Sequence, residues 1–456
     1  MEKGYRRGGG VLLLDWWDEA ARKLWISFRK AGFEGPVIVV HDQGFLPEDV
    51  ISVCRWFCER QDLGEGGAKD GRREKVRARF FNEIERPDFW EITSGSSGGE
   101  VRDKNHLRGR IFFSAPSNRR LARRVDWLDE SETVRFSDHY DAAGSLYARS
   151  TYDGSGNKIQ MTWFDKDGVE RLTENMVTRD LILNSDGKMR IIRNRTELVI
   201  LLFEKMDIKG ERIFYNSLST PFFVSERLLS TGRKHLLFWQ EPPREDIPGN
   251  MLGILNGTSG TEKVLVQNAE SFSKLKEHGA NAARLQLFGY LYPYSREDTY
   301  GREILICTNS DMIEALQELV TDLPDMRFSI AAVTEMSAKL LAMGRFSNVS
   351  LYPCAKADTL RALYGRCDYY LDINYGKEIL SAVKEAYLHN QLILAFPRTI
   401  HDPTYTAEEN IASSINNMEE IIRKCASDRQ EMDRRLTLQK KAALDEPAAA
   451  YQKLIR

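Results

Sequence analysis

The sequence predicts an α/β protein in which two Rossmann-like domains follow one another and an antiparallel β-meander is inserted in the first of them. Three observations lead to this fold class. Short apolar runs alternate with helical patterns at the start of the chain, an aspartate then recurs every twelve residues, and the alternation of strands and helices resumes afterwards. The length of 456 residues is enough for roughly two to four domains.

The composition is that of an ordinary globular protein. Hydrophobic residues make up 42% of the chain and charged residues 29%, and 65 Lys and Arg residues are balanced by 67 Asp and Glu residues. The overall charge therefore names no partner, and we expect no nucleic acid. Six cysteines are too few for a disulfide scaffold and suit a reducing cytoplasm, and Cys54 and Cys58 have no adjacent histidine that would suggest a metal site. We find no run of about 18 apolar residues and expect no membrane-spanning helix.

The first domain, predicted to begin with residues 1–75, opens with a β-α-β unit. Residues 11–15 predict a buried parallel strand because the first four of them are apolar, and a 3.6-residue pattern from Trp16 to Phe28 predicts the next helix. The apolar residues 36–40 predict a second strand, joined to the first by a right-handed crossover. A glycine-rich loop at 62–71 follows, to which we assign no function.

The inserted meander is predicted over residues 76–190 from the twelve-residue repeat. A large apolar residue precedes each aspartate, and glycine stands three residues after most of them. The repeating positions are Asp129, Asp141, Asp153 and Asp165, with Gly144, Gly156 and Gly168. Asp and Gly supply the turn chemistry that tight antiparallel reversals require. Between the turns, Ile159, Met161 and Trp163 alternate with polar neighbours, which predicts that they share one face of the sheet.

The segment 165–168 also resembles the start of a calcium-binding loop. That interpretation fails because no Glu stands at the twelfth position and Lys166 occupies a neighbouring site. We therefore interpret Asp165 as a turn residue and expect no metal.

After the meander, the first domain is predicted to resume over residues 191–295. The predicted strands are 213–215, 236–239, 264–266 and 285–288. A second Rossmann-like domain is predicted over 296–405, with helical patterns at 312–319 and 360–364. Its predicted strands are 304–306, 328–330, 349–351, 369–372 and 392–396. Residues 406–456 are predicted as helices that cross back onto the first domain, and the charged run 428–441 as a solvated helix, because acids are interspersed among its bases.

Two Rossmann-like domains that face a cleft form the GT-B-like architecture of many sugar-nucleotide glycosyltransferases. In retaining enzymes of that fold, two glutamates eight residues apart lie near the transferred sugar and the ribose. Here Glu385 falls at the second of these positions, but Lys377 stands eight residues before it, and Glu378 is about 100° out of phase on a helix. Residues 307–311 offer no Arg or Lys to neutralise a diphosphate leaving group. We predict that Glu378 and Glu385 are remnants of a donor site that no longer works.

Other catalytic motifs are absent from the sequence. There is no GxSxG, HExxH or Walker A motif, and no GxGxxG after a strand. The best single candidate for chemistry is the pair His41 and Asp42, at the carboxyl end of a predicted parallel strand, with a structural or exposed role as the alternative. The sequence thus predicts no catalytic residue and no cofactor.

Several segments together resemble one bacterial family. They are GFLPEDV at 44–50, PDFWEI at 87–92, FYNSLSTPF at 214–222, FWQEP at 238–242, IPGNM at 247–251 and LDIN at 371–374. Over nearly its whole length the chain resembles the stabilising, or chaperone, subunit of the peptide O-GlcNAc transferase that works with the bacterial accessory Sec system. The departures from that family are the glycine-rich loop and a glycine-containing N-terminal extension.

The resemblance implies a non-catalytic subunit that pairs with a catalytic glycosyltransferase subunit. The catalytic subunit takes UDP-N-acetylglucosamine and modifies Ser and Thr of serine-rich repeat adhesins before export, while this subunit stabilises it and helps to hold the unfolded acceptor. It implies a cytoplasmic protein, with peripheral association with the inner membrane face through the complex as an open possibility. Two alternatives are an active UDP-sugar-dependent retaining glycosyltransferase and a carbohydrate-binding module.

The meander supplies candidate contact surfaces for the partner subunit or the acceptor. The aromatic candidates are Trp127, Tyr140, Tyr152 and Trp163. The alternative is that these side chains only pack the core of the meander. A basic cluster near its start, Arg119, Arg120, Arg123 and Arg124, has three interpretations, which are, in order of preference, a solvated face, a contact for an acidic partner and a peripheral membrane contact.

Overall fold

The computed structural model describes residues 9–59, 77–185, 187–228, 230, 232–297 and 300–456. These residues divide into two compact units, one made of 9–25, 32–287 and 455–456, and the other of 26–31 and 288–454. Helix α1 (Glu19–Lys30) begins in the first unit and ends in the second. The glycine-rich loop 62–71 and the N-terminal extension up to residue 8 lie outside the described residues. The predicted domain limits at 75, 190, 295 and 405 stay predictions.

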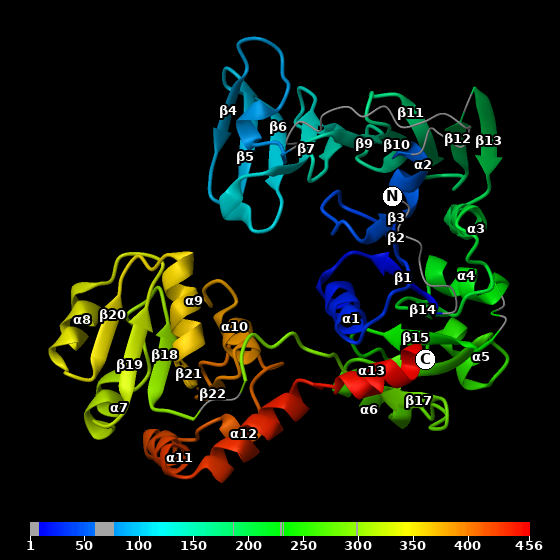
Figure 1. Ribbon diagram of the computed structural model, residues 1–456. Coiled ribbons are helices and arrows are strands. Elements are labelled where there is room, and N and C mark those ends of the chain that lie inside the picture. The colour runs from blue at the N-terminus through cyan, green and yellow to red at the C-terminus, as the bar shows by residue number, and fades with distance from the viewer. Residues whose placement is uncertain (1–8, 60–76, 186, 229, 231, 298–299) are drawn as a thin grey trace, which may run out of the picture. The chain divides into compact units, whose positions relative to one another are not determined.

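The first unit contains a parallel sheet of seven strands among its described residues, in the order β17-β16-β15-β14-β1-β2-β3 (Figure 1). Its strands form where the sequence is apolar on both faces, and Val11 to Leu14 of β1 are fully buried. The strands are β1 (Val11–Trp16), β2 (Val37–His41), β3 (Val50–Ser52), β14 (Ile213–Tyr215), β15 (His235–Trp239), β16 (Thr261–Val266) and β17 (Leu285–Leu287). The helices beside α1 are α2 (Val53–Glu59), α3 (Arg195–Lys205), α4 (Thr220–Arg227), α5 (Gly249–Leu255) and α6 (Ala269–Glu277). The predicted β-α-β opening and the resumption of the sheet after the insertion are confirmed.

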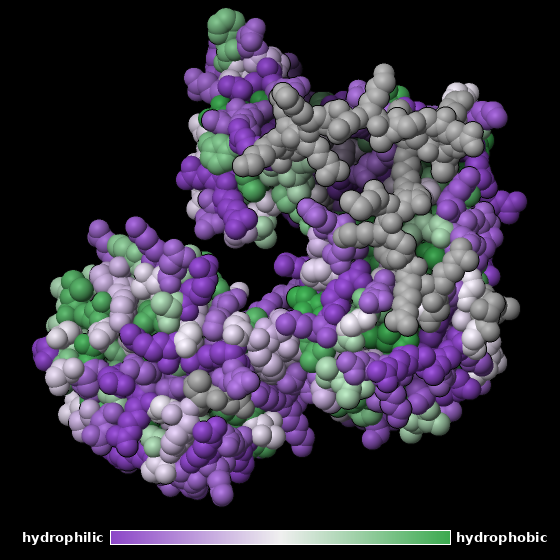
Figure 2. Space-filling view, viewed as in Figure 1, coloured by the Kyte–Doolittle hydropathy of each residue, from purple (hydrophilic) through white to green (hydrophobic). Residues whose placement is uncertain are grey.

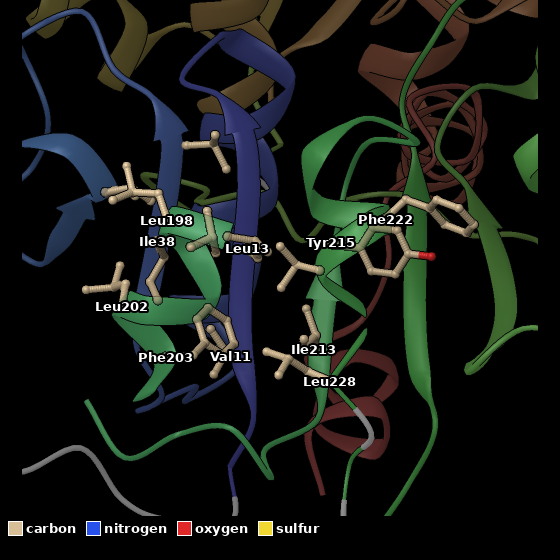
Figure 3. Packing of buried hydrophobic residues seen from close by; sticks show 14 of the residues in the cluster. Val11, Leu13, Ile38, Leu198, Leu202, Phe203, Ile213, Tyr215, Phe222 and Leu228 are labelled. Carbon is tan, nitrogen blue, oxygen red and sulfur yellow. The ribbon is translucent and has the colours of Figure 1, made fainter. Parts of the chain in front are cut away.

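One face of this sheet packs against α3 and the α4 region. Figure 3 shows the strand side chains directed toward the helix side chains in a single cluster of buried residues. The strands contribute Val11, Leu13, Ile38, Ile213 and Tyr215, and the helical segments contribute Leu198, Leu202, Phe203, Phe222 and Leu228. Full burial of each side chain of this size contributes about 1.5–3 kcal/mol to folding. This cluster fixes where the carboxyl ends of the strands lie.

The insertion is an antiparallel sheet of ten strands among the described residues, which pair in sequence order from β4 to β13. The strands are β4 (Glu91–Ser94), β5 (Gly98–Asp103), β6 (His106–Phe113), β7 (Ala122–Leu128), β8 (Val134–Tyr140), β9 (Leu146–Tyr152), β10 (Lys158–Phe164), β11 (Glu170–Asn175), β12 (Leu181–Ser185) and β13 (Lys188–Ile192). Short 3-10 helices precede β4 and β7, namely η1 (Phe81–Glu83) and η2 (Ser117–Arg119). The predicted meander is confirmed.

The twelve-residue repeat forms the turns of this sheet. Asp153 Oδ1 accepts hydrogen bonds from the backbone N–H groups of Ser155 and Asn157, both at 2.9 Å, and Gly156 has a φ of +81°. The turns at Asp141 and Asp165 are built in the same way. At Asp129 the sequence has no glycine, and Glu132 takes the left-handed conformation with a φ of 59°. Aspartate side chains that mimic a backbone turn therefore close these four hairpins.

The two faces of the meander do not divide simply into apolar and polar. Trp163 is buried and Met161 half-buried on one face, as predicted, but Ile159 is 37% exposed and lies at a β-bulge between Lys158 and Gln160. Thr162, on the opposite face, is buried. The simple alternation fails because the bulge places Lys158, rather than Ile159, on the face of Met161 and Trp163.

Helix α2 lies against β10 and β11 and joins the meander to the first sheet (Figure 1). The same buried cluster that fills the first sheet includes Cys54 and Cys58 of α2 and Trp163 and Leu172 of the meander. Both cysteines are free thiols, and burial raises the pKa of Cys54 to about 12. The meander and the first sheet thus share one core, and these thiols serve as small apolar side chains in it.

The second unit contains a parallel sheet of five strands among its described residues, in the order β20-β19-β18-β21-β22. The strands are β18 (Glu303–Cys307), β19 (Arg327–Ala331), β20 (Val349–Tyr352), β21 (Tyr369–Asp372) and β22 (Leu392–Ala395). The helical elements are α7 (Leu316–Asp322), α8 (Ala338–Leu341), η3 (Ala342–Arg345), α9 (Ala357–Arg366), α10 (Ala382–Leu388), η4 (Glu408–Asn410), α11 (Ile415–Ser427), α12 (Arg429–Ala442) and α13 (Ala448–Ile455). The predicted second Rossmann-like sheet is confirmed.

Two helical predictions in the second unit need correction. The helix predicted from residue 312 begins only at Leu316, because Ile313 forms a bridge with Asn374 and Ala315 has a φ of 54°. The charged run 428–441 does form helix α12, but Met432 and Leu436 on one of its faces are buried in the core. This helix is therefore amphipathic rather than fully solvated.

The visible surface of each unit is mostly hydrophilic (Figure 2). Hydrophobic colour gathers over α8 and β20, and Leu341 of α8 is 49% exposed. Among the described residues, no helix is both long enough and apolar enough to cross a membrane.

Candidate functional site

The first unit has a cavity of about 610 Å³ at the carboxyl ends of β1 and β2. Ligands of open α/β sheets bind at this edge because loops and helix starts converge there. The first sheet contributes Trp16 and His41, the start of α3 contributes Asn194 and Arg195, and meander strands form the opposite wall. The meander side chains are Arg123, Arg124, His139, Tyr147, Lys158, Met161, Trp163, Glu174, Met176 and Arg179. The insertion thus encloses one end of the first sheet.

His41, predicted as the best candidate for chemistry, lies in this cavity. Its ring stacks on Trp16, with centroids 4.3 Å apart and planes 8° apart, and its Nε2 is 3.7 Å from Oδ1 of Asp15. Burial, followed by the cations Arg195 and Lys158, lowers the pKa of His41 to about 3. The imidazole is therefore neutral at physiological pH and can accept or donate a hydrogen bond but adds no charge.

The neighbouring carboxylates are held by the protein itself. Asp15 is buried, and its Oδ2 accepts a hydrogen bond from Ser217 at 2.9 Å, while burial raises its pKa. Asp42, the partner that sequence analysis assigned to His41, instead accepts a hydrogen bond from the backbone N–H of Gly44. The structure therefore places Asp15, and not Asp42, beside the imidazole.

Arg195 connects the meander to the first sheet across the cavity floor. Its Nε donates to both carboxylate oxygens of Glu174 at 3.0 Å, and its Nη1 donates to the carbonyl of Val40 at 3.2 Å. The side chains of Arg195 and Glu174 are only 12% and 4% exposed. Asn194 caps α3 by accepting the N–H of Glu197 at 3.0 Å, which fixes Arg195 in the first turn. The sequence signals the cap, through Asn194 and Glu197 three positions apart, but not the ion pair.

The four predicted aromatic candidates do not form one surface. Trp163 is opposite Ala148 and shares a face with His139, whereas Trp127 donates to Asp138 at 2.9 Å on the other face. Tyr140 is buried in the meander core, and Tyr152 accepts a hydrogen bond from Ser137 at 3.3 Å. Trp163 and Tyr140 therefore serve the core, while Trp127 and Tyr152 are half-buried.

The predicted basic cluster also divides in two. Arg119 and Arg120 are exposed around η2, with the Arg120 guanidinium 6.0 Å from the Phe81 ring. Arg123 and Arg124 follow on β7 and line the cavity. These four residues are close in the sequence, but only Arg123 and Arg124 belong to the strand that begins at Ala122, whereas Arg119 and Arg120 precede it.

The predicted donor remnants lie at the carboxyl edge of the second sheet, in the second unit. Glu378 is in the loop before α10 and accepts the N–H of Val383 at 2.9 Å, so it caps the start of that helix. Burial raises the pKa of Glu378. Glu385 lies within α10, so the two carboxylates do not share a helix. Leu380 and Ser381, both at positive φ, separate them.

Other polar groups at this edge are also bonded internally. The Thr308 hydroxyl lies 3.0 Å from Oδ1 of Asn374, which also accepts the N–H of Gly376 at 2.8 Å. Asn309 accepts the N–H of Val333 at 3.1 Å, and Asp311 accepts the hydroxyl of Ser337 at 2.9 Å. The segment where transferases place phosphate-binding cations thus holds its own loops together.

A histidine at the same edge is charged but already paired. His401 Nδ1 lies 2.5 Å from Oδ1 of Asp372, and its Nε2 lies 2.6 Å from the carbonyl of Gly376. The hydrogen bond to Asp372 raises the pKa of His401 to about 9. Asp372 is 2% exposed, and its negative charge cancels that of the imidazolium.

The calcium interpretation of segment 165–168 is not supported by the geometry. Asp165 Oδ1 accepts the backbone N–H groups of Asp167 and Val169, and its Oδ2 binds Arg171 at 2.7 Å. Within the described residues no group of three or more His, Cys, Asp or Glu side chains is placed to hold a metal ion.

Comparison with known proteins covers nearly the whole chain. Models described as the GtfB N-terminal, middle and third domains match residues 11–57, 90–193 and 195–277, and a GftB/GlyA-F C-terminal domain model matches 304–439. A Streptococcus gordonii protein, the UDP-N-acetylglucosamine–peptide N-acetylglucosaminyltransferase stabilizing protein GtfB, is 35% identical over 98% of this chain and 98% of its own. The chain belongs to the GtfB family.

Other relatives agree with this GtfB assignment. The stabilizing protein GtfB of Streptococcus agalactiae is 36% identical over 88% of this chain and 89% of its own. A chain in the crystal structure of a GtfA/B complex bound to UDP and GlcNAc matches with a TM-score of 0.84 and 34% identity, over 97% of this chain and 98% of that one. The GT-B-like fold and the family predicted from the sequence motifs are thereby confirmed.

Proposed function

We propose that this chain is the non-catalytic stabilising and acceptor-binding subunit of a two-subunit peptide O-GlcNAc transferase. The complex would glycosylate Ser and Thr of serine-rich repeat adhesins before accessory Sec export, and the partner is the catalytic glycosyltransferase subunit. The observation that carries the proposal is the 35% identity, over 98% of the chain, to a protein named for stabilising such a transferase.

The chemistry of the second unit supports a non-catalytic role. Transfer from a nucleotide sugar requires a cation or metal at the leaving diphosphate. At the carboxyl edge of the second sheet, Glu378 caps a helix and His401 is neutralised by Asp372. These groups stabilise the fold of a transferase without being available to a donor.

The acceptor would be an unfolded chain rich in serine, so its recognition depends on hydrogen bonds and on surfaces that tolerate changes of register. The meander is our candidate surface for this acceptor or for the catalytic subunit. Its edge strand β13 exposes Met189 and Ile191, each 68% exposed, and Trp127 and Tyr152 are half-buried on its faces. An unpaired edge strand with apolar side chains favours strand addition by a partner.

We place the protein in the cytoplasm, with peripheral contact to the inner face of the membrane through the complex. The free cysteines fit a reducing compartment. The exposed residues Arg119 and Arg120 are the part of the predicted basic cluster that remains available for an acidic partner or an anionic lipid surface.

Co-expression with the catalytic subunit tests the proposal. The full chain should co-purify with that subunit in one complex, whose mass gives the stoichiometry. The isolated chain should release no UDP from UDP-N-acetylglucosamine, whereas the complex should release UDP when a serine-rich acceptor is added. Robust UDP release by the isolated chain would instead identify an active transferase.

Two substitutions test the meander surface within the same experiment. Trp127→Ala and Tyr152→Ala should reduce the yield of the complex or its affinity for the acceptor while the isolated variants stay folded. The matched control is Phe89→Ala on the same insertion, whose side chain is 98% exposed. Comparison of bare and GlcNAc-modified acceptor completes the test, because a carbohydrate-binding module would ignore the bare polypeptide.

A further inference from the structure

We propose that the cavity between the first sheet and the meander is a binding site for a small phosphate-bearing molecule. This inference goes beyond the proposed function and does not depend on it. It rests on the cavity's unpaired cations, its apolar wall and its size.

Three cations of the cavity wall have no acidic partner among the described residues. Lys158 and Arg179 line the cavity, and no hydrogen bond or ion pair of either side chain is present within the described part of the chain. Arg123 donates only to the neutral amide oxygen of Gln43. Because they come from β10, from the turn after β11 and from β7, the meander brings together charges that repel one another.

The acids of the same wall do not cancel these charges. Glu174 is held by Arg195 through a bidentate ion pair, and Asp42 accepts the backbone N–H of Gly44. Arg124, the remaining cation of the wall, pairs with Asp126 at 2.9 Å. Cations without an internal counter-ion therefore remain for a ligand, and multiply charged anions satisfy them best.

The two histidines of the cavity respond to this positive field. Burial, followed by Lys158, Arg124 and Arg123, lowers the pKa of His139 to about 3, in parallel with His41. His139 Nε2 lies 2.9 Å from the hydroxyl of Ser150. Both imidazoles are neutral polar groups that can complete the hydrogen bonds of a bound anion without repelling it.

The start of α3 adds a further positive contribution. This helix has 11 residues, and Asn194, Arg195 and Thr196 at its N-terminus all line the cavity. N-terminal N–H groups and the helix dipole favour anions. The α3 N-terminus and the meander cations therefore both contribute donors to this cavity.

The rest of the wall suits a ring attached to the phosphate. Trp16 is 49% exposed and stacks on His41, and Met161 and Trp163 form an apolar surface opposite. The volume of about 610 Å³ falls within the range of small-molecule sites. A phosphorylated sugar or a nucleotide has this combination of charge and ring, whereas an acidic polypeptide would gain little from the aromatic wall.

Calorimetric titration of the full-length chain with inorganic pyrophosphate and with UMP tests the site. We expect both probes to bind, and Lys158→Gln and Arg123→Gln each to weaken pyrophosphate about tenfold, as loss of one charge-assisted hydrogen bond implies. Matched controls on the same sheet are Lys188→Gln and Arg190→Gln, which are exposed on β13 away from the cavity. These controls should bind as the unchanged chain does.

Three outcomes would overturn the proposal. Absence of binding at millimolar pyrophosphate would show that the cations are only solvated. Equal weakening by Lys188→Gln would show general attraction to a basic surface. Binding of an oligoglutamate peptide that pyrophosphate cannot displace would assign the cavity to an acidic polypeptide. Thermal unfolding of each variant confirms that it is folded, and none of these outcomes bears on whether the chain assembles with a catalytic subunit.

Discussion

The carboxyl ends of the two parallel sheets differ in whether their polar side chains are bonded within the protein. In the first unit, Lys158, Arg123 and Arg179 face a cavity without acidic partners among the described residues. In the second unit, Asn374 and His401 are bonded to the protein itself. The same type of sheet edge therefore offers charge to a ligand in one unit and uses its polar groups for its own stability in the other.

The difference teaches that a Rossmann-like sheet does not determine its site. Parallel strands place loops and helix starts at one edge, but the side chains there decide whether a ligand is bound. In the first unit the meander supplies the cations that lack acidic partners, and in the second unit the segments after β18, β21 and β22 supply the polar side chains.

The largest loss of stability should follow from removing the charge of Arg195, which links the meander to the first sheet. Arg195→Met leaves the buried carboxylate of Glu174 unpaired, which should lower the free energy of unfolding by about 3–5 kcal/mol. Chemical denaturation of the full chain measures the change. Arg190→Met, on an exposed strand of the same meander, is the control and should be nearly neutral. A similar small change in both variants would mean that the ion pair does not fasten the meander to the sheet.

At the carboxyl edge of the second sheet, His401 should make the free energy of unfolding depend on pH. The folded pKa of His401 is raised to about 9 from 6.5, so its stabilisation is complete below about pH 6.5 and is lost as the pH rises through 9. A rise of this size corresponds to about 3 kcal/mol, and solvent screening of the partly exposed imidazole reduces the loss to on the order of 2 kcal/mol. Denaturation curves at acidic and alkaline pH should therefore differ more for the unchanged chain than for His401→Gln. His106→Gln, at an exposed position of the meander, should keep the full pH dependence.

The smallest expected effect is a difference in stability between variants of the two donor remnants, Glu378 and Glu385. Glu378→Ala removes the carboxylate that accepts the Val383 N–H and should cost about 1 kcal/mol, whereas Glu385→Ala should change stability by less than about 0.5 kcal/mol. Both are measured by denaturation of the full chain. Neither substitution should alter UDP release by the complex. If Glu385→Ala alone stopped transfer, the second edge would still take part in donor chemistry.

Much of the fold could be predicted because its signals are local. Residues 11–14 and 36–40 are continuously apolar, which is typical of buried parallel strands. Asp141 with Gly144, and the equivalent pairs in later turns, specify tight reversals through their own side chains and positive φ. These elements therefore appear at the predicted positions.

The cavity could not be predicted because it depends on contacts between distant residues. Lys158 and Arg123 are far apart in the sequence and meet only through the register of β7 to β10. Likewise, Trp127 and Trp163 occupy equivalent repeat positions but lie on opposite faces. Sequence spacing gave the strands, whereas strand register and the packing of α2 decided which side chains share a cavity.

The self-contained turns of the meander have a consequence for length variation in this insertion. Each strand of the meander pairs only with the strands next to it, and each turn reverses the direction of the chain. If a single strand with its turn were gained or lost, the last strand of the insertion would end at the opposite end of the sheet, away from α3. Natural or engineered homologues should therefore lengthen or shorten this region by pairs of hairpin strands, in steps that return the backbone to the same side.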